Sequence, residues 1–167
     1  MRHLILSALL AIGTTTAAIT PTSANAQSYS ASKLIYNFDL DTLRAVVSDM
    51  GGSVRTKDNG DYEIQFANGT VSGVEFTVCG SGKCYGTHLR ATFGKPSDKS
   101  VAETERLVAE FNKDIRTVKS YSTGEGRSTV SMYIIADGGL TMENYRMQLA
   151  VLEDALQIMR EKIYTNG

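Results

Sequence analysis

The sequence predicts an α+β fold, in which an antiparallel sheet of about six strands is covered by helices. Apolar residues recur at steps of three and four over residues 141–163, which predicts a long amphipathic helix. Residues 40–50 and 100–112 repeat this pattern over shorter lengths. Between the helical stretches, apolar and polar residues alternate in segments bounded by glycine, as is typical of strands. The expected element order is α-β-β-β-β-α-β-β-α, in one domain at 38–164.

The first helix, at residues 40–50, has clear start and stop signals. Asp39 is a suitable N-cap, and Gly51 can adopt the left-handed conformation that ends a helix. Strands are then expected at 53–57 and 62–71, because apolar side chains alternate with polar ones there.

Two turns compete in the stretch after residue 66. Asn68-Gly69 and Ser72-Gly73 both have residue types that turns favour. The Ser72-Gly73 turn is preferred, because a new alternation begins at Val74 and continues through Phe76 and Val78, which predicts a third strand there. Asn68-Gly69 would then be a bulge within the strand.

The second half of the chain repeats the alternation of strands and helices. Its expected elements are strand 85–93, helix 100–112, strands 116–122 and 127–136, and helix 141–163. Strand 127–136 carries apolar residues toward both of its faces, which favours a central position in the sheet. Thr141 is the expected N-cap of the last helix.

The last helix has a wide apolar face. Its main stripe consists of Met142, Tyr145, Leu149, Leu152, Leu156, Met159 and Ile163. A second row, formed by Val151, Ala155 and Ile158, runs beside it. Either the sheet covers both rows, or the second row contacts a partner protein or a second copy of the chain.

The first 26 residues have the features of a secretory signal peptide. A short basic start precedes an apolar stretch at 4–12, which is too short to span a membrane, and residues 24–26 form an Ala-x-Ala cleavage site. We therefore expect export, with a mature chain of 141 residues that begins at Gln27. Residues 27–37 are expected to form a flexible leader.

The charge balance of the mature chain excludes two classes of partner. Without Arg2 the chain has 16 Lys and Arg residues against 18 Asp and Glu residues, a net charge of −2. This balance argues against a dedicated nucleic-acid binder and gives no attraction to an anionic membrane. After signal cleavage we expect no membrane association.

Cys79 and Cys84 are the only cysteines, and both lie in the mature chain. In an oxidising compartment, the default expectation is a disulfide across a tight hairpin. The alternative is a small-ligand or metal site that adds His88, which lies four residues after Cys84 and on the same strand face. The sequence contains no recognised catalytic motif, so we expect neither an enzyme nor a cofactor.

Several short segments, in their order along the chain, resemble the YbjN-domain family. They are residues 43–51, 61–62, 73–78, the Cys79/Cys84 pair, Phe93, 111–112 and 138–144. Members of this family are described as bacterial sensory transduction regulators, and their fold is similar to that of type III secretion chaperones. The resemblance spans residues 38–162, although this chain lacks the tryptophans common in the family.

The resemblance implies a bacterial protein. Together with the predicted signal peptide, this favours a location in the periplasm over secretion into the medium. The family supplies no catalytic residues. We therefore expect an exported, non-enzymatic module that acts by protein–protein binding, in a regulatory or chaperone-like role. Its partner is either another protein or a second copy of the chain, which would form a homodimer.

Overall fold

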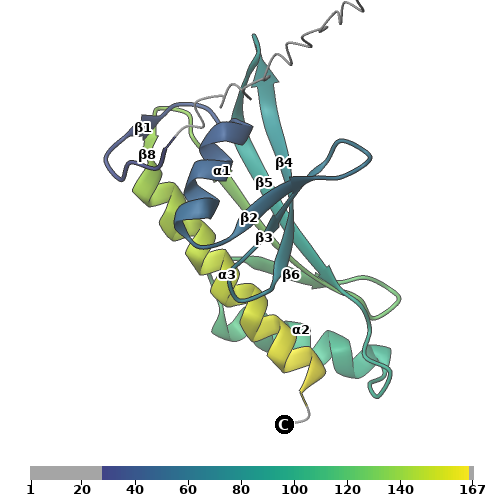
Figure 1. Ribbon diagram of the computed structural model, residues 1–167. Coiled ribbons are helices and arrows are strands. Elements are labelled where there is room, and N and C mark those ends of the chain that lie inside the picture. The colour runs from purple at the N-terminus through teal and green to yellow at the C-terminus, as the bar shows by residue number, and fades with distance from the viewer. Residues whose placement is uncertain (1–27, 166–167) are drawn as a thin grey trace, which may run out of the picture.

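The computed structural model describes residues 28–165, in which three helices lie against one face of a six-stranded antiparallel sheet (Figure 1). The predicted fold class is confirmed, and the three helices and six sheet strands follow the predicted order. The helices are α1 (Leu40–Asp49), α2 (Val101–Asp114) and α3 (Met142–Tyr164). The sheet strands, in spatial order, are β2 (Ser53–Thr56), β3 (Tyr62–Gln65), β4 (Val71–Gly80), β5 (Lys83–Phe93), β7 (Ser128–Ile135) and β6 (Lys119–Ser122).

Each helix begins at a side-chain cap that the sequence contains. Asp39 accepts a hydrogen bond from the Thr42 amide at 2.7 Å, and Thr141 accepts one from the Asn144 amide at 3.1 Å. At α2, Ser100 and Glu103 form a reciprocal capping box. These contacts satisfy amide groups that would otherwise lack partners in the first turn.

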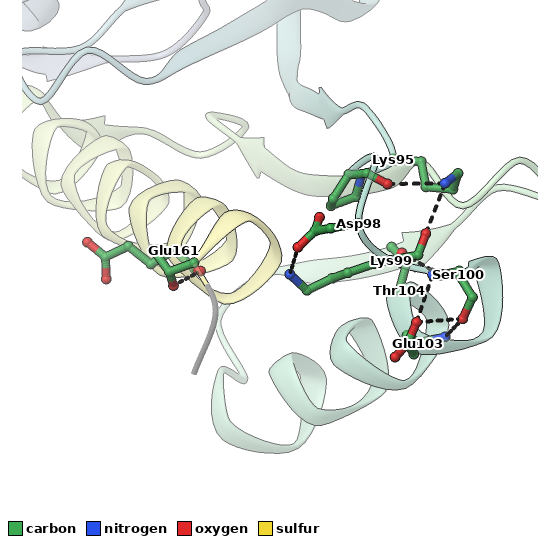
Figure 2. A network of polar contacts seen from close by, with 9 residues as sticks. Lys95, Asp98, Lys99, Ser100, Glu103, Thr104 and Glu161 are labelled. Atoms are coloured by element: carbon green, nitrogen blue, oxygen red, sulfur yellow. Dashed lines mark hydrogen bonds and ion pairs between the residues drawn. The ribbon is translucent and has the colours of Figure 1, made fainter.

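The connection from β5 to α2 is held by its own polar contacts, which Figure 2 shows. The Lys95 ammonium donates hydrogen bonds to the carbonyls of Pro96 and Lys99, at 3.1 and 2.9 Å. Lys99 in turn forms an ion pair with Asp98 at 3.3 Å. The loop therefore presents Ser100 to α2 in a fixed position.

One apolar core lies between the helices and the covered face of the sheet. The sheet contributes Ile64, Val74, Leu89, Val130 and Ile134, all of them buried. The seven residues of the predicted α3 stripe are completely buried over this layer. The spacing of three and four therefore identified the core-facing side of α3 correctly.

The preferred turn after residue 66 is wrong. β3 ends at Gln65 and β4 begins at Val71, so the chain turns at Asn68-Gly69, with Gly69 in the left-handed region at φ +80°. The backbone amide of Asn68 donates a hydrogen bond to the carboxylate of Glu153 in α3 at 3.1 Å. The turn is also held locally, because Asn68 Oδ1 accepts hydrogen bonds from the Thr70 amide and hydroxyl at 2.9 and 2.7 Å. The alternation of apolar residues shows neither contact.

The expected flexible leader also needs correction for the part that the structure describes. Leu34–Ile35 forms strand β1, which pairs with β8 (Leu140–Thr141) just before α3. The carbonyls of Lys33 and Ala31 accept hydrogen bonds from the first two amides of α3, at 2.8 and 3.1 Å. The leader therefore caps α3 and buries Ile35.

The predicted signal peptide at 1–26 and its cleavage site lie outside the described residues. None of the helices in the described part of the chain is both long and apolar enough to cross a bilayer.

Candidate protein-binding surfaces

The second apolar row of α3 divides into buried and exposed parts. Ala155 is 2% exposed and belongs to the core, Val151 is half-buried, and Ile158 is 41% exposed. Met147, at 48% exposure, lies one turn before Val151. At about 100° per residue, Met147, Val151 and Ile158 lie within about 40° of one another around the helix axis. We call these three residues the α3 edge.

A groove opens beside the first half of the α3 edge. It has a volume of about 280 Å³ and lies where α3 meets β7 and the connection before β6. Its lining consists of Thr117, Met132, Asn144, Met147, Gln148 and Val151. None of these side chains carries a charge, so the groove suits an apolar side chain with a few hydrogen bonds at its rim.

The predicted disulfide is present between Cys79 and Cys84. The two residues pair directly across β4 and β5, and the turn between them passes through Ser81 and Gly82, both with positive φ. The bond therefore closes the tip of the long β4–β5 hairpin, which carries an exposed Val78 next to it.

The disulfide removes both thiolates from the alternative metal site. His88 instead contacts Ser131, with its Nε2 atom 2.8 Å from Ser131 Oγ, and its Nδ1 atom lies 3.7 Å from a Glu75 oxygen. Within residues 28–165, no three His, Cys, Asp or Glu side chains are grouped to hold a metal ion. The structure therefore does not bring Cys79, Cys84 and His88 together as ligands.

The face of the sheet that no helix covers carries charged and polar side chains together with exposed Tyr133 and Ile135, and we call it the open face. One cross-strand row runs through all six strands and consists of Arg55, Glu63, Gly73, Arg90, Ser131 and Lys119. The alternation of strand side chains sends these residues away from the helices. The open face is thus an uncovered surface of the fold that is separate from the α3 edge.

Glu63 is the buried carboxylate of this row, at 7% exposure. Burial acts to raise its pKa, but hydrogen bonds from Lys57 and Arg55 outweigh burial, and the net shift of the Glu63 pKa is downward. Glu63 is therefore ionised and already neutralised by two cations, with Lys57 Nζ 2.9 Å from its carboxylate.

A second ionic cluster joins the leader to the start of α3. Tyr29 donates a hydrogen bond to Glu143, and Arg146 donates two more to the same carboxylate, at 2.8 and 2.7 Å. Hydrogen bonds from Arg146 and then from Tyr29 lower the pKa of Glu143 to about 2. This cluster anchors residues that were expected to be flexible.

The sequence analysis proposed Val151, Ala155 and Ile158 as interface residues, but Ala155 is buried in the core, and Met147 and the open-face row were missed. Met147 could have been found, because it lies one helical turn before Val151. The open-face row depends on the register of six strands, which the sequence pattern left uncertain at the turn after β3.

These features define a small α+β domain that has uncovered surfaces and a disulfide-closed hairpin. The profile of the YbjN family, described as "Putative bacterial sensory transduction regulator", matches residues 39–164. The chain belongs to the YbjN family, as the sequence resemblance indicated.

A solved structure supports the same fold. It is described as "Crystal structure of YbjN, a putative transcription regulator from E. coli" and matches with a TM-score of 0.60 and 16% sequence identity. The match covers 76% of this chain and 91% of that one. At this identity it establishes similarity of fold. No curated protein matches the chain.

Proposed function

We propose that this chain is an exported, non-enzymatic member of the YbjN family that acts by protein–protein binding, in a regulatory or chaperone-like role. The observation that carries the proposal is the α3 edge with its uncharged groove. The description of the family as a regulator of sensory transduction is consistent with this role.

The α3 edge has the properties of a contact surface. Met147 and Ile158 are large apolar side chains at 48% and 41% exposure, and Val151 joins them at the groove. Met132 and Met147 bring two thioethers to the groove, and flexible methionine side chains adapt to different partner shapes. We infer that an apolar side chain of a partner protein fills this groove.

The surroundings of His88 support a non-enzymatic role. Its contact with Ser131 resembles a base beside a hydroxyl nucleophile, but the Glu75 oxygen at 3.7 Å is beyond hydrogen-bond distance. Backbone amides of a sheet lie in the plane of the sheet, so none points from the open face toward a developing oxyanion.

Affinity capture from a bacterial periplasmic extract tests the α3 edge. Mature protein, a Val151→Ser/Ile158→Ser variant and a Val78→Ser control serve as baits, and captured proteins are then purified and tested for direct binding. Val78 is 64% exposed near the tip of the β4–β5 hairpin, so its variant is matched in chemistry but not in location. We expect wild type and control to bind one partner, and the double variant to bind it about tenfold more weakly.

Equal direct binding by all three baits would remove the α3 edge from the interface. Matching urea midpoints of the baits verify that folding is preserved. Light scattering of the mature protein tests whether the partner is a second copy, because a monomer at high micromolar concentration contradicts a homodimer.

Export is tested separately by fractionating cells that express the full chain. We expect the periplasmic or secreted fraction to hold a protein whose mass and N-terminal residue correspond to cleavage before Gln27. An uncleaved chain in the cytoplasmic fraction would contradict export.

A further inference from the structure

The charges of the open face are distributed unequally between its two halves. The half over β2, β3 and β4 carries three carboxylates, of Asp61, Glu63 and Glu75, against Arg55 and Lys57. The half over β5, β7 and β6 carries three cations, Arg90, Lys119 and Arg127, against the single carboxylate of Glu125. Arg90 stands at the boundary between the halves, because it also lines a hollow with Asp61, Glu63 and Glu75. A protein with an overall negative charge therefore presents a local positive region.

Two of these cations have no acidic partner. No carboxylate of the described residues lies within ion-pair distance of Arg90 or Lys119, whereas Arg127 pairs with Glu125 at 3.4 Å. Lys119 lies over the Tyr121 ring, with its Nζ atom 5.8 Å from the ring centroid. Both cations are therefore free to bind an external anion.

The small side chain of Ser131 separates the two free cations. Arg90 and Lys119 both pair with Ser131, one from each neighbouring strand. Since adjacent strands are about 4.8 Å apart, their backbones lie about 10 Å from each other across Ser131. The Ser131 hydroxyl contacts His88 Nε2 at 2.8 Å, so the imidazole borders this position, and a carboxylate would lie between the outer ends of the Arg90 and Lys119 side chains.

The surroundings of this position add hydrogen-bonding groups. A hollow of about 520 Å³ adjoins Arg90, and its lining includes Tyr121, Thr92 and Thr129 together with Glu125 and Arg127. The hydroxyls of Thr92 and Thr129 lie 3.0 Å apart and bond to each other, whereas Tyr121 is partly exposed. Hydroxyls beside cations are common in sites that bind carboxylates, because guanidinium and hydroxyl groups both donate to the same oxygens.

We propose that the open face over β5, β7 and β6 docks an acidic segment of a partner protein, one carboxylate of which bridges Arg90 and Lys119 above Ser131. This inference rests on the proposed protein-binding role and adds a second surface to it, distinct from the α3 edge. Charge complementarity selects the occupant: the positive half of the face attracts carboxylates and repels basic segments.

Fluorescence anisotropy with labelled peptides tests the site directly. The probes are a ten-residue glutamate peptide, a ten-residue lysine peptide and a single-stranded DNA oligonucleotide of similar charge. We expect the mature protein to bind the glutamate peptide, and raised salt to weaken binding through screening. An Arg90→Gln/Lys119→Gln variant should bind it about tenfold or more weakly, as loss of charged hydrogen bonds predicts.

Two controls separate this site from general charge and from the α3 edge. Lys113→Gln removes an exposed cation of α2, and it should leave glutamate-peptide binding unchanged. The Val151→Ser/Ile158→Ser variant should also bind the glutamate peptide normally, so that failure of either surface is recognised independently.

Several results would overturn the inference. They are an absence of glutamate-peptide binding at millimolar concentration, equal weakening by Lys113→Gln, equal binding of the lysine peptide, and tighter binding of the DNA. A dimer that the Arg90→Gln/Lys119→Gln variant dissociates would assign the surface to a second copy instead.

Discussion

The two faces of β5 differ in role: one packs against the helices and stabilises the fold, and the other is exposed to partners. Leu89 is completely buried under the helices, while its neighbour Arg90 projects from the open face and has no acidic partner in residues 28–165. The same alternation holds in β7, where Met132 is buried and Tyr133 is exposed. One face of the sheet is therefore constrained by packing, and the other is available for binding to partner proteins.

Substitution of Leu89 should have the largest effect on the free energy of unfolding and substitution of Arg90 the smallest, although the two residues are adjacent. Leu89→Ala should lower the free energy of unfolding by about 2–5 kcal/mol, because it leaves a cavity in the core. Arg90→Ala should change it by about 0.5 kcal/mol or less. Urea denaturation of both variants measures the contrast, and similar losses would show that the open face is also part of the stabilising structure.

The disulfide should contribute an intermediate effect, because it closes only a short loop. Cys79→Ser/Cys84→Ser should lower the free energy of unfolding by about 2 kcal/mol on the loop-entropy model. Urea denaturation without reductant checks this value, with mass spectrometry verifying a two-dalton deficit in the wild type. A variant as stable as the wild type would show that the hairpin register is set by strand pairing alone.

A smaller, pH-dependent effect is expected at the Glu143 cluster. The pKa of Glu143 is about 2 in the folded chain, against an ordinary value of 4.5. A lowered folded-state pKa stabilises the protein above pH 4.5, and this contribution is lost as pH falls toward 2. The stability difference between wild type and Glu143→Gln should therefore shrink across that range. A difference independent of pH from 5 to 2.5 would contradict the cluster.

The covered side of the molecule could be predicted well from the sequence. The spacing of three and four located all seven core residues of α3, and the caps Asp39 and Thr141 placed two helix starts. Such signals are local, because a helix repeats its contact face every turn. The Cys79–Cys84 pair was likewise evident from its spacing and the expected compartment.

The uncovered surfaces depended on contacts between distant segments. Glu153 contacts the turn at Asn68, and Glu143 anchors Tyr29 across 114 positions of the chain. Without these contacts, neither the strand register nor the order of the leader could be inferred. Arg90 and Lys119 lie on either side of Ser131 because of that register, so no sequence motif predicts their placement.

Oxidation of Met147 tests the proposed α3 contact most directly. Its thioether is in an exposed side chain, whereas Met142 and Met159 of the same helix are completely buried and serve as internal references. In dilute hydrogen peroxide, Met147 should form sulfoxide readily in the free protein and several-fold more slowly once the captured partner is bound. Equal rates of Met147 oxidation in the free and bound protein would contradict binding at the α3 edge.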